Sequence, residues 1–406
     1  MLRALSVLAA AVLAAATGAS AAEPIKLGLM YDATGPTAAP GKPMVLGIRD
    51  YVMAVNANGG VNGRQIEWVE HETGYKAAEA AVAYDQFKAA KVVAFLAWGT
   101  PSAVALVDKA DADKLPMVTP GFGLSSSADG AKHPYSFPLA ATLWSQATGA
   151  VQHIIDQSKG TDPKKLKVAY LYMDNPAGQE PRPVMAALQK KLGFELKEFA
   201  VPMPGTDFTA QVEDITRRFK ADWVVMFTFG KGAAASMKEL KRAAMPMDHV
   251  IGISMAGTNE LDFEAADWAT VEGLKTVHFV GSESDTKIHK MIKDAYAKAG
   301  KEVPADMTKA PTLYNWGVVI GAAFVTGLKN AKGLDGPALK AGLESITALD
   351  GADGWLPALK VSAADHEGGG FVRAYQVKSK KLVPVGEWMQ AFHDDEWALV
   401  KNPPAK

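Results

Sequence analysis

The sequence predicts an α/β protein of two doubly wound, Rossmann-like lobes with parallel sheets, joined by three crossovers. Short β-rich runs alternate with helical patterns from residue 25 onward, which is typical of parallel sheets covered by helices on both faces. The chain has 406 residues, a length that fits two domains better than one. Glycine, proline and aspartate gather at three points, which we interpret as the passages of the chain between the lobes.

The N-terminus has the pattern of a secretory signal peptide. Arg3 provides a positive start, and residues 5–16 form an apolar run that is too short to span a bilayer. Ala19-Ser20-Ala21 then offers a small-x-small cleavage site. We therefore expect residues 1–22 to be removed and the mature protein to reside in the periplasm. The chain contains no cysteine, so we expect no lipid anchor and a stability that depends on the hydrophobic core.

Strand and helix patterns follow one another in a regular order. The run at 25–30 is typical of a buried strand, and apolar residues at helical spacing follow it until Asn58-Gly59-Gly60 ends the helix. Further strands are expected at 66–70, 92–96, 115–118, 167–173, 222–227, 250–253 and 274–280. From Phe371 the pattern instead predicts two short strands with no helix between them.

The three crossovers divide the chain into two discontinuous lobes. We place them near residues 138–143, 267–274 and 350–357. The first lobe then comprises residues 23–140 and 274–354, and the second comprises residues 141–273 and 355–406. A ligand cleft is expected between the lobes.

Local motifs recur in a consistent order from about Ile25 to Trp388. They are Thr34-Gly35-Pro36, the run NANGGVNGR at 56–64, Gly99-Thr100-Pro101-Ser102, residues 118–121 and 204–208, and Asp365-His366 ahead of Tyr375-Gln376-Val377. This series resembles type I periplasmic solute-binding proteins of the branched-chain amino-acid ABC transporter family, the leucine-binding-protein-like group. The resemblance implies two α/β lobes that close around a small ligand, and the permease and ATPase of an ABC importer as partners.

The main candidate site residues follow two strands of the first lobe, because ligands of open parallel sheets sit beyond the carboxyl ends of the strands. After one strand come Trp98 and Thr100, and we expect Thr100 to cap the next helix, whose free N–H groups would face a carboxylate. After the next strand come Gly121, Phe122 and Gly123, and the glycines allow close approach of the backbone to a ligand. In the amino-acid-binding relatives the corresponding loop holds the ligand's carboxylate and ammonium. Ordinary helix capping and loop packing are the alternatives.

In the second lobe, Phe229 and Ser254 each follow a strand. The relatives place an aromatic ligand contact near Phe229, and Ser254 stands at or next to their acidic position that pairs with an ammonium. Ala177 occupies the place of the usual tyrosine. These departures favour an aromatic or largely apolar carboxylate over an α-amino acid, since an ammonium buried unpaired would cost several kcal/mol. The alternative is that another acid, such as Glu260, binds an ammonium, and that the ligand is a branched-chain amino acid or an amide.

Two enzymatic functions are the alternatives, and both depend on motifs that are incomplete in this sequence. The run from Gly252 to Ala256 around Ser254 lacks the second glycine of a nucleophile elbow, which leaves a secreted α/β serine hydrolase using Ser254 as an alternative. Gly230 and Gly232 fit a loose dinucleotide pattern, but the next strand ends at Ser254 rather than at an acid that would bind ribose. The eight histidines show no metal-ligand spacing, and we interpret His366 as a surface or turn residue.

We therefore expect a binding protein rather than an enzyme, with no cofactor and no metal. The net charge is −1, and no concentrated basic face points to a nucleic acid or a membrane surface. The expected function is capture of a small carboxylate, with an aromatic acid favoured, by a monomer that delivers it to an ABC importer. A sensor of the same fold that delivers its ligand to a receptor is the other possibility within this class.

Overall fold

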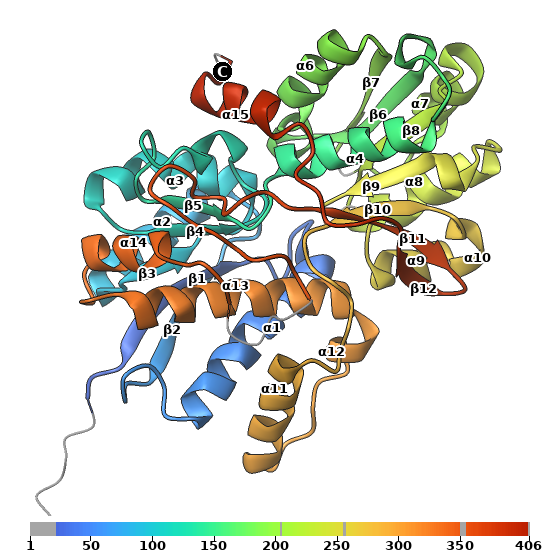
Figure 1. Ribbon diagram of the computed structural model, residues 1–406. Helices are drawn as coiled ribbons and strands as arrows, with labels where there is room; N and C mark the ends of the chain where they lie inside the picture. The colour runs from blue at the N-terminus through green and yellow to red at the C-terminus, as the bar shows by residue number, and fades with distance from the viewer. Residues whose placement is uncertain (1–21, 204, 255–256, 350–354, 405–406) are drawn as a thin grey trace, which may run out of the picture.

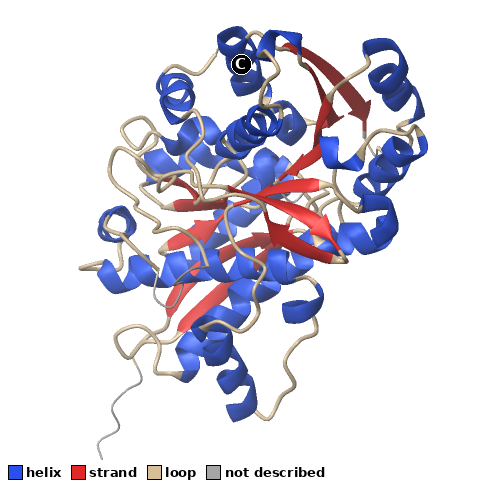
Figure 2. Cartoon of the chain, turned by 45° about the vertical axis from the view of Figure 1, so that its right-hand side comes forward, coloured by secondary structure: helices blue, strands red, loops and turns tan. Residues whose placement is uncertain are grey.

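The computed structural model describes residues 22–203, 205–254, 257–349 and 355–404. Its strands form two separate sheets, and helices cover both, so that two lobes lie side by side (Figures 1 and 2). The predicted fold class is confirmed. Most of the expected signal peptide lies outside the described residues. Within the described ranges, no helix has the length and apolar character needed to cross a membrane.

The sheet of the first lobe has five parallel strands in the order β2-β1-β3-β4-β5. Their bounds are β1 Ile25–Tyr31, β2 Ile66–Glu72, β3 Ala94–Leu96, β4 Met117–Pro120 and β5 Ser136–Leu139. The sequence patterns do not predict β5, which contains Pro138. Its place at the edge of the sheet tolerates a residue without a backbone N–H.

The sheet of the second lobe has seven strands in the order β12-β11-β10-β9-β8-β6-β7. Their bounds are β6 Lys167–Asp174, β7 Glu195–Pro202, β8 Trp223–Phe227, β9 Val250–Ile253, β10 Lys275–His278, β11 Arg373–Lys378 and β12 Lys381–Pro384. The first five are parallel, whereas β11 and β12 add an antiparallel hairpin, as expected. The patterns do not predict β7, an edge strand whose residues are largely exposed or partly exposed.

Helices connect these strands and cover the sheets. The first lobe carries α1 Ala38–Ala57, α2 Ala77–Ala90, α3 Gly99–Asp113, α11 Lys287–Lys298, α12 Asp306–Lys309, α13 Pro311–Asn330, α14 Gly336–Glu344 and the short turn η1 Ser125–Ala128. The second lobe carries α4 Leu143–Gln157, α5 Pro176–Gln179, α6 Arg182–Leu192, α7 Thr209–Glu213, α8 Lys231–Arg242, α9 Glu260–Ala266 and α10 Trp268–Val271. A π-helical segment, Asp214–Phe219, continues α7, and short 3₁₀ turns lie at Pro163–Lys165 and Met247–His249. The last helix, α15 His393–Lys401, contacts α6 and α4 of the second lobe and η1 of the first.

Two of the three crossovers differ from their predicted places. The first passes between β5 and α4, within the predicted range 138–143. The second was expected near 267–274, but β10 pairs with β9 and β11, so residues 275–278 belong to the second lobe and the chain leaves it after His278. The apolar run at 274–280 carries no local signal of which sheet it joins. This prediction of the boundary is therefore wrong.

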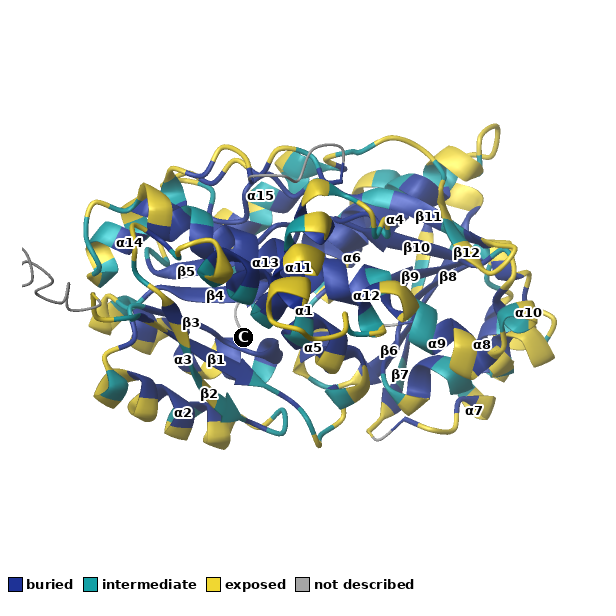
Figure 3. Ribbon diagram, turned by 90° about the horizontal axis from the view of Figure 1, so that it is seen from below, coloured by how far each residue is buried: buried dark blue, intermediate teal, exposed yellow. Residues whose placement is uncertain are grey.

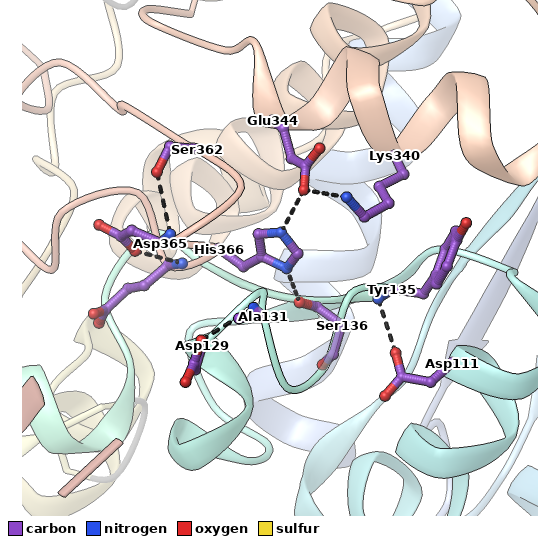
Figure 4. Close-up of polar contacts among 11 residues, drawn as sticks. Asp111, Asp129, Ala131, Tyr135, Ser136, Lys340, Glu344, Ser362, Asp365 and His366 are labelled. Carbon is purple, nitrogen blue, oxygen red and sulfur yellow. Dashed lines mark hydrogen bonds and ion pairs between the residues drawn. The ribbon is translucent and has the colours of Figure 1, made fainter. Parts of the chain in front are cut away.

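The third crossover lies beyond its predicted range of 350–357, part of which falls outside the described residues. The segment after Trp355 still packs on the first lobe, where the N–H of Val361 donates to Ile346 and that of His366 to Ala128. Figure 4 shows His366 between the carbonyl oxygen of Ser136, at 2.8 Å, and the carboxylate of Glu344, at 3.0 Å. His366 is therefore a buried anchor rather than a surface residue. Residues 355–367 extend the first lobe, and the chain crosses after them.

The core of the first lobe depends on close contact between α1 and α13. A Cβ atom on Gly317 of α13 would lie 1.8 Å from the carbonyl oxygen of Met44 in α1. A Cβ atom on Gly47 of α1 would lie 2.1 Å from the carbonyl oxygen of Tyr314. Figure 3 shows α13 and the inner strands, such as β4, β8 and β9, as mostly buried, with the exposed residues on the outer helices and loops. The two glycines thus set the distance between the helices, and α13 holds the first-lobe sheet on which the candidate site is built.

Candidate functional site

The loop after β3 starts α3 one residue earlier than expected. Gly99 has a φ of +81°, a conformation that favours glycine, and α3 begins there. Thr100 therefore lies inside the first turn and does not cap the helix, which corrects the prediction. No side chain caps α3 through its N-cap residue, Trp98. The Thr100 hydroxyl is free of a capping role and donates across to the second lobe, as described below.

Trp98 is completely buried in the first lobe. Its indole N–H donates to the Thr37 hydroxyl at 2.9 Å, and its ring meets the ring of Phe122 edge to face at 5.6 Å. Phe122 also contacts Trp316 of α13, with ring centroids 6.1 Å apart. The structure thus brings the two predicted aromatic residues together, with Trp98 packed behind Phe122 and against the start of α1.

The loop after β4 needs its glycines. Gly121 has a φ of +69° and Gly123 a φ of +143°. A Cβ atom on Gly121 would lie 2.7 Å from the carbonyl oxygen of Ala141 and equally close to the ring of Phe279. From the second lobe, the Gln146 amide donates to the Gly121 carbonyl oxygen at 3.0 Å. This loop therefore lies where the two lobes meet.

A carboxylate of the second lobe occupies the donors of these two loops. Glu180, between α5 and α6, accepts hydrogen bonds from the Ser125 N–H and hydroxyl, both at 2.7 Å, and from the Thr100 hydroxyl at 3.1 Å. Its own carbonyl oxygen accepts from the Trp144 indole at 2.7 Å. Burial raises the pKa of the Glu180 carboxyl, while the hydrogen bonds from Ser125, Thr100 and Gly123 oppose that rise. The first-lobe loops therefore bind the carboxylate of Glu180, and we call their donors, on Thr100 and Ser125, the carboxylate receptor.

The opposite side of the seam between the lobes is aromatic. Tyr75 of the first lobe and Phe229 of the second face one another with ring centroids 6.3 Å apart. A Cβ atom on Gly99 would lie 2.4 Å from the Tyr75 ring, so Tyr75 lies directly against the start of α3. Burial, with smaller contributions from Glu180 and Asp32, raises the pKa of the Tyr75 phenol above its usual range. A neutral aromatic wall thus borders the carboxylate receptor.

Ser254 follows β9 and is completely buried, with a φ of +59°. Its hydroxyl finds no hydrogen-bond partner among the described residues. Gly230 and Gly232, which fit a loose dinucleotide pattern, lie at the N-cap and in the first turn of α8. The Ser254 hydroxyl is therefore a buried polar group that no described residue satisfies.

Glu260, the alternative acid, also lies at the seam. It begins α9 and accepts a hydrogen bond from the Thr312 hydroxyl of α13 at 2.7 Å, which again joins the two lobes. Its Oε2 atom finds no partner within the described part of the chain. Burial raises the pKa of Glu260 to about 7. An amine at this point would find a carboxyl group that gains its charge near neutral pH.

Two openings reach the seam from the surface. The larger is a groove of about 960 Å³ between α3 and the α5–α6 region. Its lining includes Thr100, Leu124, Trp144, Glu180 and Arg182. The smaller is a pocket of about 370 Å³ on the side of Phe229, where Pro36 and Lys42 of the first lobe face Met203 and Lys231 of the second. The carboxylate receptor thus adjoins the large groove.

Sequence patterns do not predict that Glu180, Ser125 and Tyr75 belong to the site. Glu180 is a single acid in a polar stretch, and its role depends on donors that lie 55 and 80 positions away in the chain. The signal that could have identified Glu180 is its place just after β6, at the same edge of the sheet as Phe229 and Ser254. Spacing alone does not reveal its contact with the other lobe.

Comparison with known proteins now assigns the family. A match to the periplasmic binding protein family covers residues 24–381. The chain belongs to the periplasmic binding protein family. A relative named Leu/Ile/Val-binding protein homolog 7, from Brucella suis, is 25% identical over 349 residues, which are 83% of this chain and 84% of the relative.

Solved structures agree with this assignment. One from the Pseudomonas fluorescens group, described as an ABC transporter permease, is 29% identical with a TM-score of 0.81, and the match covers 93% of this chain and 95% of that chain. A solute-binding protein of an ABC transporter from R. palustris, in complex with benzoate, is 20% identical with a TM-score of 0.72, covering 89% and 96%. Members of the periplasmic binding protein family bind small ligands and work with the permeases and ATPases of ABC transporters; they are not enzymes. The hydrolase and oxidoreductase alternatives are thereby set aside.

Proposed function

We propose that this periplasmic binding protein captures a small aromatic carboxylate between its lobes for an ABC importer. The observation that carries the proposal is the donor set of Thr100 and Ser125, which binds both oxygens of a carboxylate in a half-buried setting. Charge-assisted hydrogen bonds of this kind favour carboxylates over neutral groups. Tyr75, Phe122 and Phe229 supply aromatic surface, each contact contributing about 0.5–1.5 kcal/mol beyond burial.

The residues at the ends of the second-lobe strands support a ligand that has a carboxylate but no amine. Ser254 offers a hydroxyl rather than a carboxylate, so an ammonium at this place would find no charge partner in the side chain. The relative in complex with benzoate is a precedent for this ligand class on the same fold.

One observation favours a second candidate, a branched-chain amino acid or an amide. Glu260 keeps one oxygen without a partner among the described residues, at a point where the two lobes meet. The name of the Brucella suis relative points to the same ligand class for that protein. If an ammonium pairs with Glu260, binding should require the charged carboxylate and should strengthen as the pH rises through 7.

Isothermal titration calorimetry separates the two candidates. Benzoate and phenylpropanoid acids are titrated against leucine, isoleucine and valine, first with the wild type and then with Glu260→Gln. The proposal predicts micromolar binding of an aromatic acid and little effect of Glu260→Gln. Micromolar binding of leucine that Glu260→Gln abolishes, without a response to aromatic acids, would instead establish the second candidate.

A further inference from the structure

Glu180 reaches from the second lobe to the first with its carboxylate. Oε1 accepts two hydrogen bonds from Ser125, and Oε2 accepts one from Thr100. From its own lobe, the Trp144 indole holds the Glu180 carbonyl oxygen at 2.7 Å, which orients the residue toward the seam. Both oxygens are therefore engaged by the groups that we propose to bind a ligand's carboxylate.

A ligand carboxylate and Glu180 compete for the same place. Two carboxylates that share one donor set cannot both remain ionised, because like charges at short range in a half-buried site repel strongly. Ser125 and Thr100 offer three donors in all to Glu180, and each is already used. Binding of an anionic ligand at these donors therefore requires Glu180 to leave.

The structure offers Glu180 a place to go. The groove of about 960 Å³ is lined by Glu180 itself, by Gln179 and by Arg182, whose guanidinium pairs with Glu198 at 2.6 Å. A rotation of the side chain into this groove returns the carboxylate to water and brings it toward a cation. The exchange thus replaces three hydrogen bonds by solvation rather than leaving a buried charge unpaired.

We infer that Glu180 is a specificity-determining residue that acts as an internal competitor for the ligand. Its carboxylate holds the free lobes together through Thr100 and Ser125, and a ligand carboxylate takes these donors only when Glu180 leaves them. The inference rests on the proposed function. It narrows the ligand class, because a small acid such as acetate replaces one carboxylate by another with no further gain. A carboxylate with a large apolar body gains additional burial between the lobes.

The test compares Glu180→Gln and Glu180→Ala with the wild type and with Glu239→Gln. The control removes the same charge from the same lobe, at a residue that pairs with Arg242 away from the groove. Small-angle scattering of the free proteins measures lobe separation, and calorimetry with benzoate and with acetate measures affinity. We expect both Glu180 variants to have a larger radius of gyration than the wild type and Glu239→Gln. We also expect both Glu180 variants to bind benzoate roughly tenfold more tightly. In the wild type, only the molecules in which Glu180 has left Thr100 and Ser125 can bind, whereas in the variants these donors are always free for the ligand.

Equal radii of gyration in the free wild type and both Glu180 variants would overturn the inference. Unchanged or weaker benzoate binding by the variants would overturn it as well, since it would make Glu180 a permanent support of the closed form. Failure of the proposed function has a different signature, namely that neither the wild type nor any variant binds a carboxylate. The scattering result does not depend on that outcome, so the two failures can be told apart.

Discussion

Glu367 and Glu396 share one hydrogen-bond partner, the hydroxyl of Ser145. Glu367 lies where the chain crosses for the third time, Glu396 belongs to α15, and Ser145 is in the first turn of α4. A hydroxyl donates only one proton, so one of the two carboxyl groups must carry a proton to satisfy the other contact. Burial, together with the charge of Asp365, raises the pKa of Glu367 to about 7, and burial also raises the pKa of Glu396. The crossover region therefore depends on a retained proton.

We predict that Glu367→Gln removes a pH dependence of stability. A carboxyl whose folded-state pKa is raised contributes stability that is present at low pH and is lost as the pH rises through about 7. The amide of Gln keeps the hydrogen bond without titrating. In urea unfolding, the free energy of the wild type minus that of the variant should fall by on the order of 2–3 kcal/mol from pH 5 to pH 8. Using the difference cancels the opposite trend of His153 and His278, whose lowered pKa values remain in both proteins. If this difference in the free energy of unfolding did not change with pH, Glu367 and Glu396 would not need a retained proton.

We predict that Gly317→Ala strongly destabilises the first lobe. The new methyl group would lie 1.8 Å from the Met44 carbonyl oxygen, a rigid backbone atom, so α1 and α13 must separate. Overpacking of this kind costs about 1–3 kcal/mol or more. Gly333→Ala is the control, because its methyl group would lie 3.3 Å from its nearest neighbour and its φ is ordinary. Urea unfolding should show a large loss for the first variant and a small one for the second; equal effects would mean that the helix spacing is not set by Gly317.

Much of the fold could be predicted because its strands are buried on both faces. Parallel strands such as β8 and β9 are continuous apolar runs, and their positions follow from composition. The edge strand β7 has mostly partly exposed or exposed residues, so its pattern is weak. The sheet to which β10 belongs depends on pairing with β9 and β11, one of which lies about 100 residues further along the chain. Such long-range pairing leaves no local trace.

Some features of the candidate site could also be predicted from the sequence, and others could not. The glycines at 121 and 123 announce a tight loop after a strand, and the structure gives both a positive φ. Thr100 was expected to cap a helix, yet its hydroxyl donates a hydrogen bond to Glu180, because the helix starts at Gly99. Glu180 escapes sequence analysis because its partners belong to the other lobe.

We predict that Trp98→Phe acts mainly on stability. The substitution removes the hydrogen bond from the indole to Thr37 and part of the contact with Phe122, and both lie in a fully buried position. The free energy of unfolding should fall by about 1–3 kcal/mol. Benzoate affinity in calorimetry should stay within about threefold of the wild type, while Phe229→Ala should weaken it more. A tenfold loss of affinity in Trp98→Phe would instead place the indole in contact with the ligand, as the sequence analysis expected.

We predict that Ser254→Ala affects binding and not stability, because the Ser254 hydroxyl is buried without a partner among the described residues. Removing an unsatisfied hydroxyl is close to neutral or stabilising for the fold. Val277 pairs with Ile253, so His278, the last residue of β10, lies level with Ser254, the first residue after β9. Nδ1 of His278 also lacks a partner in the described ranges. Nε2 of His278 lies 2.9 Å from the Thr258 carbonyl oxygen, which can only accept, so Nε2 carries the proton and Nδ1 is left as an acceptor. A donor and an acceptor thus remain without partners among the described residues, at the ends of two neighbouring strands.

Ser236→Ala is the matched control for this last prediction. Ser236 is equally buried, but its hydroxyl bonds to Thr228 at 2.8 Å and to the carbonyl oxygen of Ala233 at 2.9 Å. Its loss should cost about 1–3 kcal/mol in urea unfolding and leave benzoate binding unchanged. Ser254→Ala should show the reverse. Its free energy of unfolding should lie within about 0.5 kcal/mol of the wild type, and benzoate should bind at least about fivefold more weakly, because one net hydrogen bond to the ligand is lost. If Ser254→Ala destabilises the fold as much as Ser236→Ala and leaves binding intact, the hydroxyl has a structural partner and does not face the ligand.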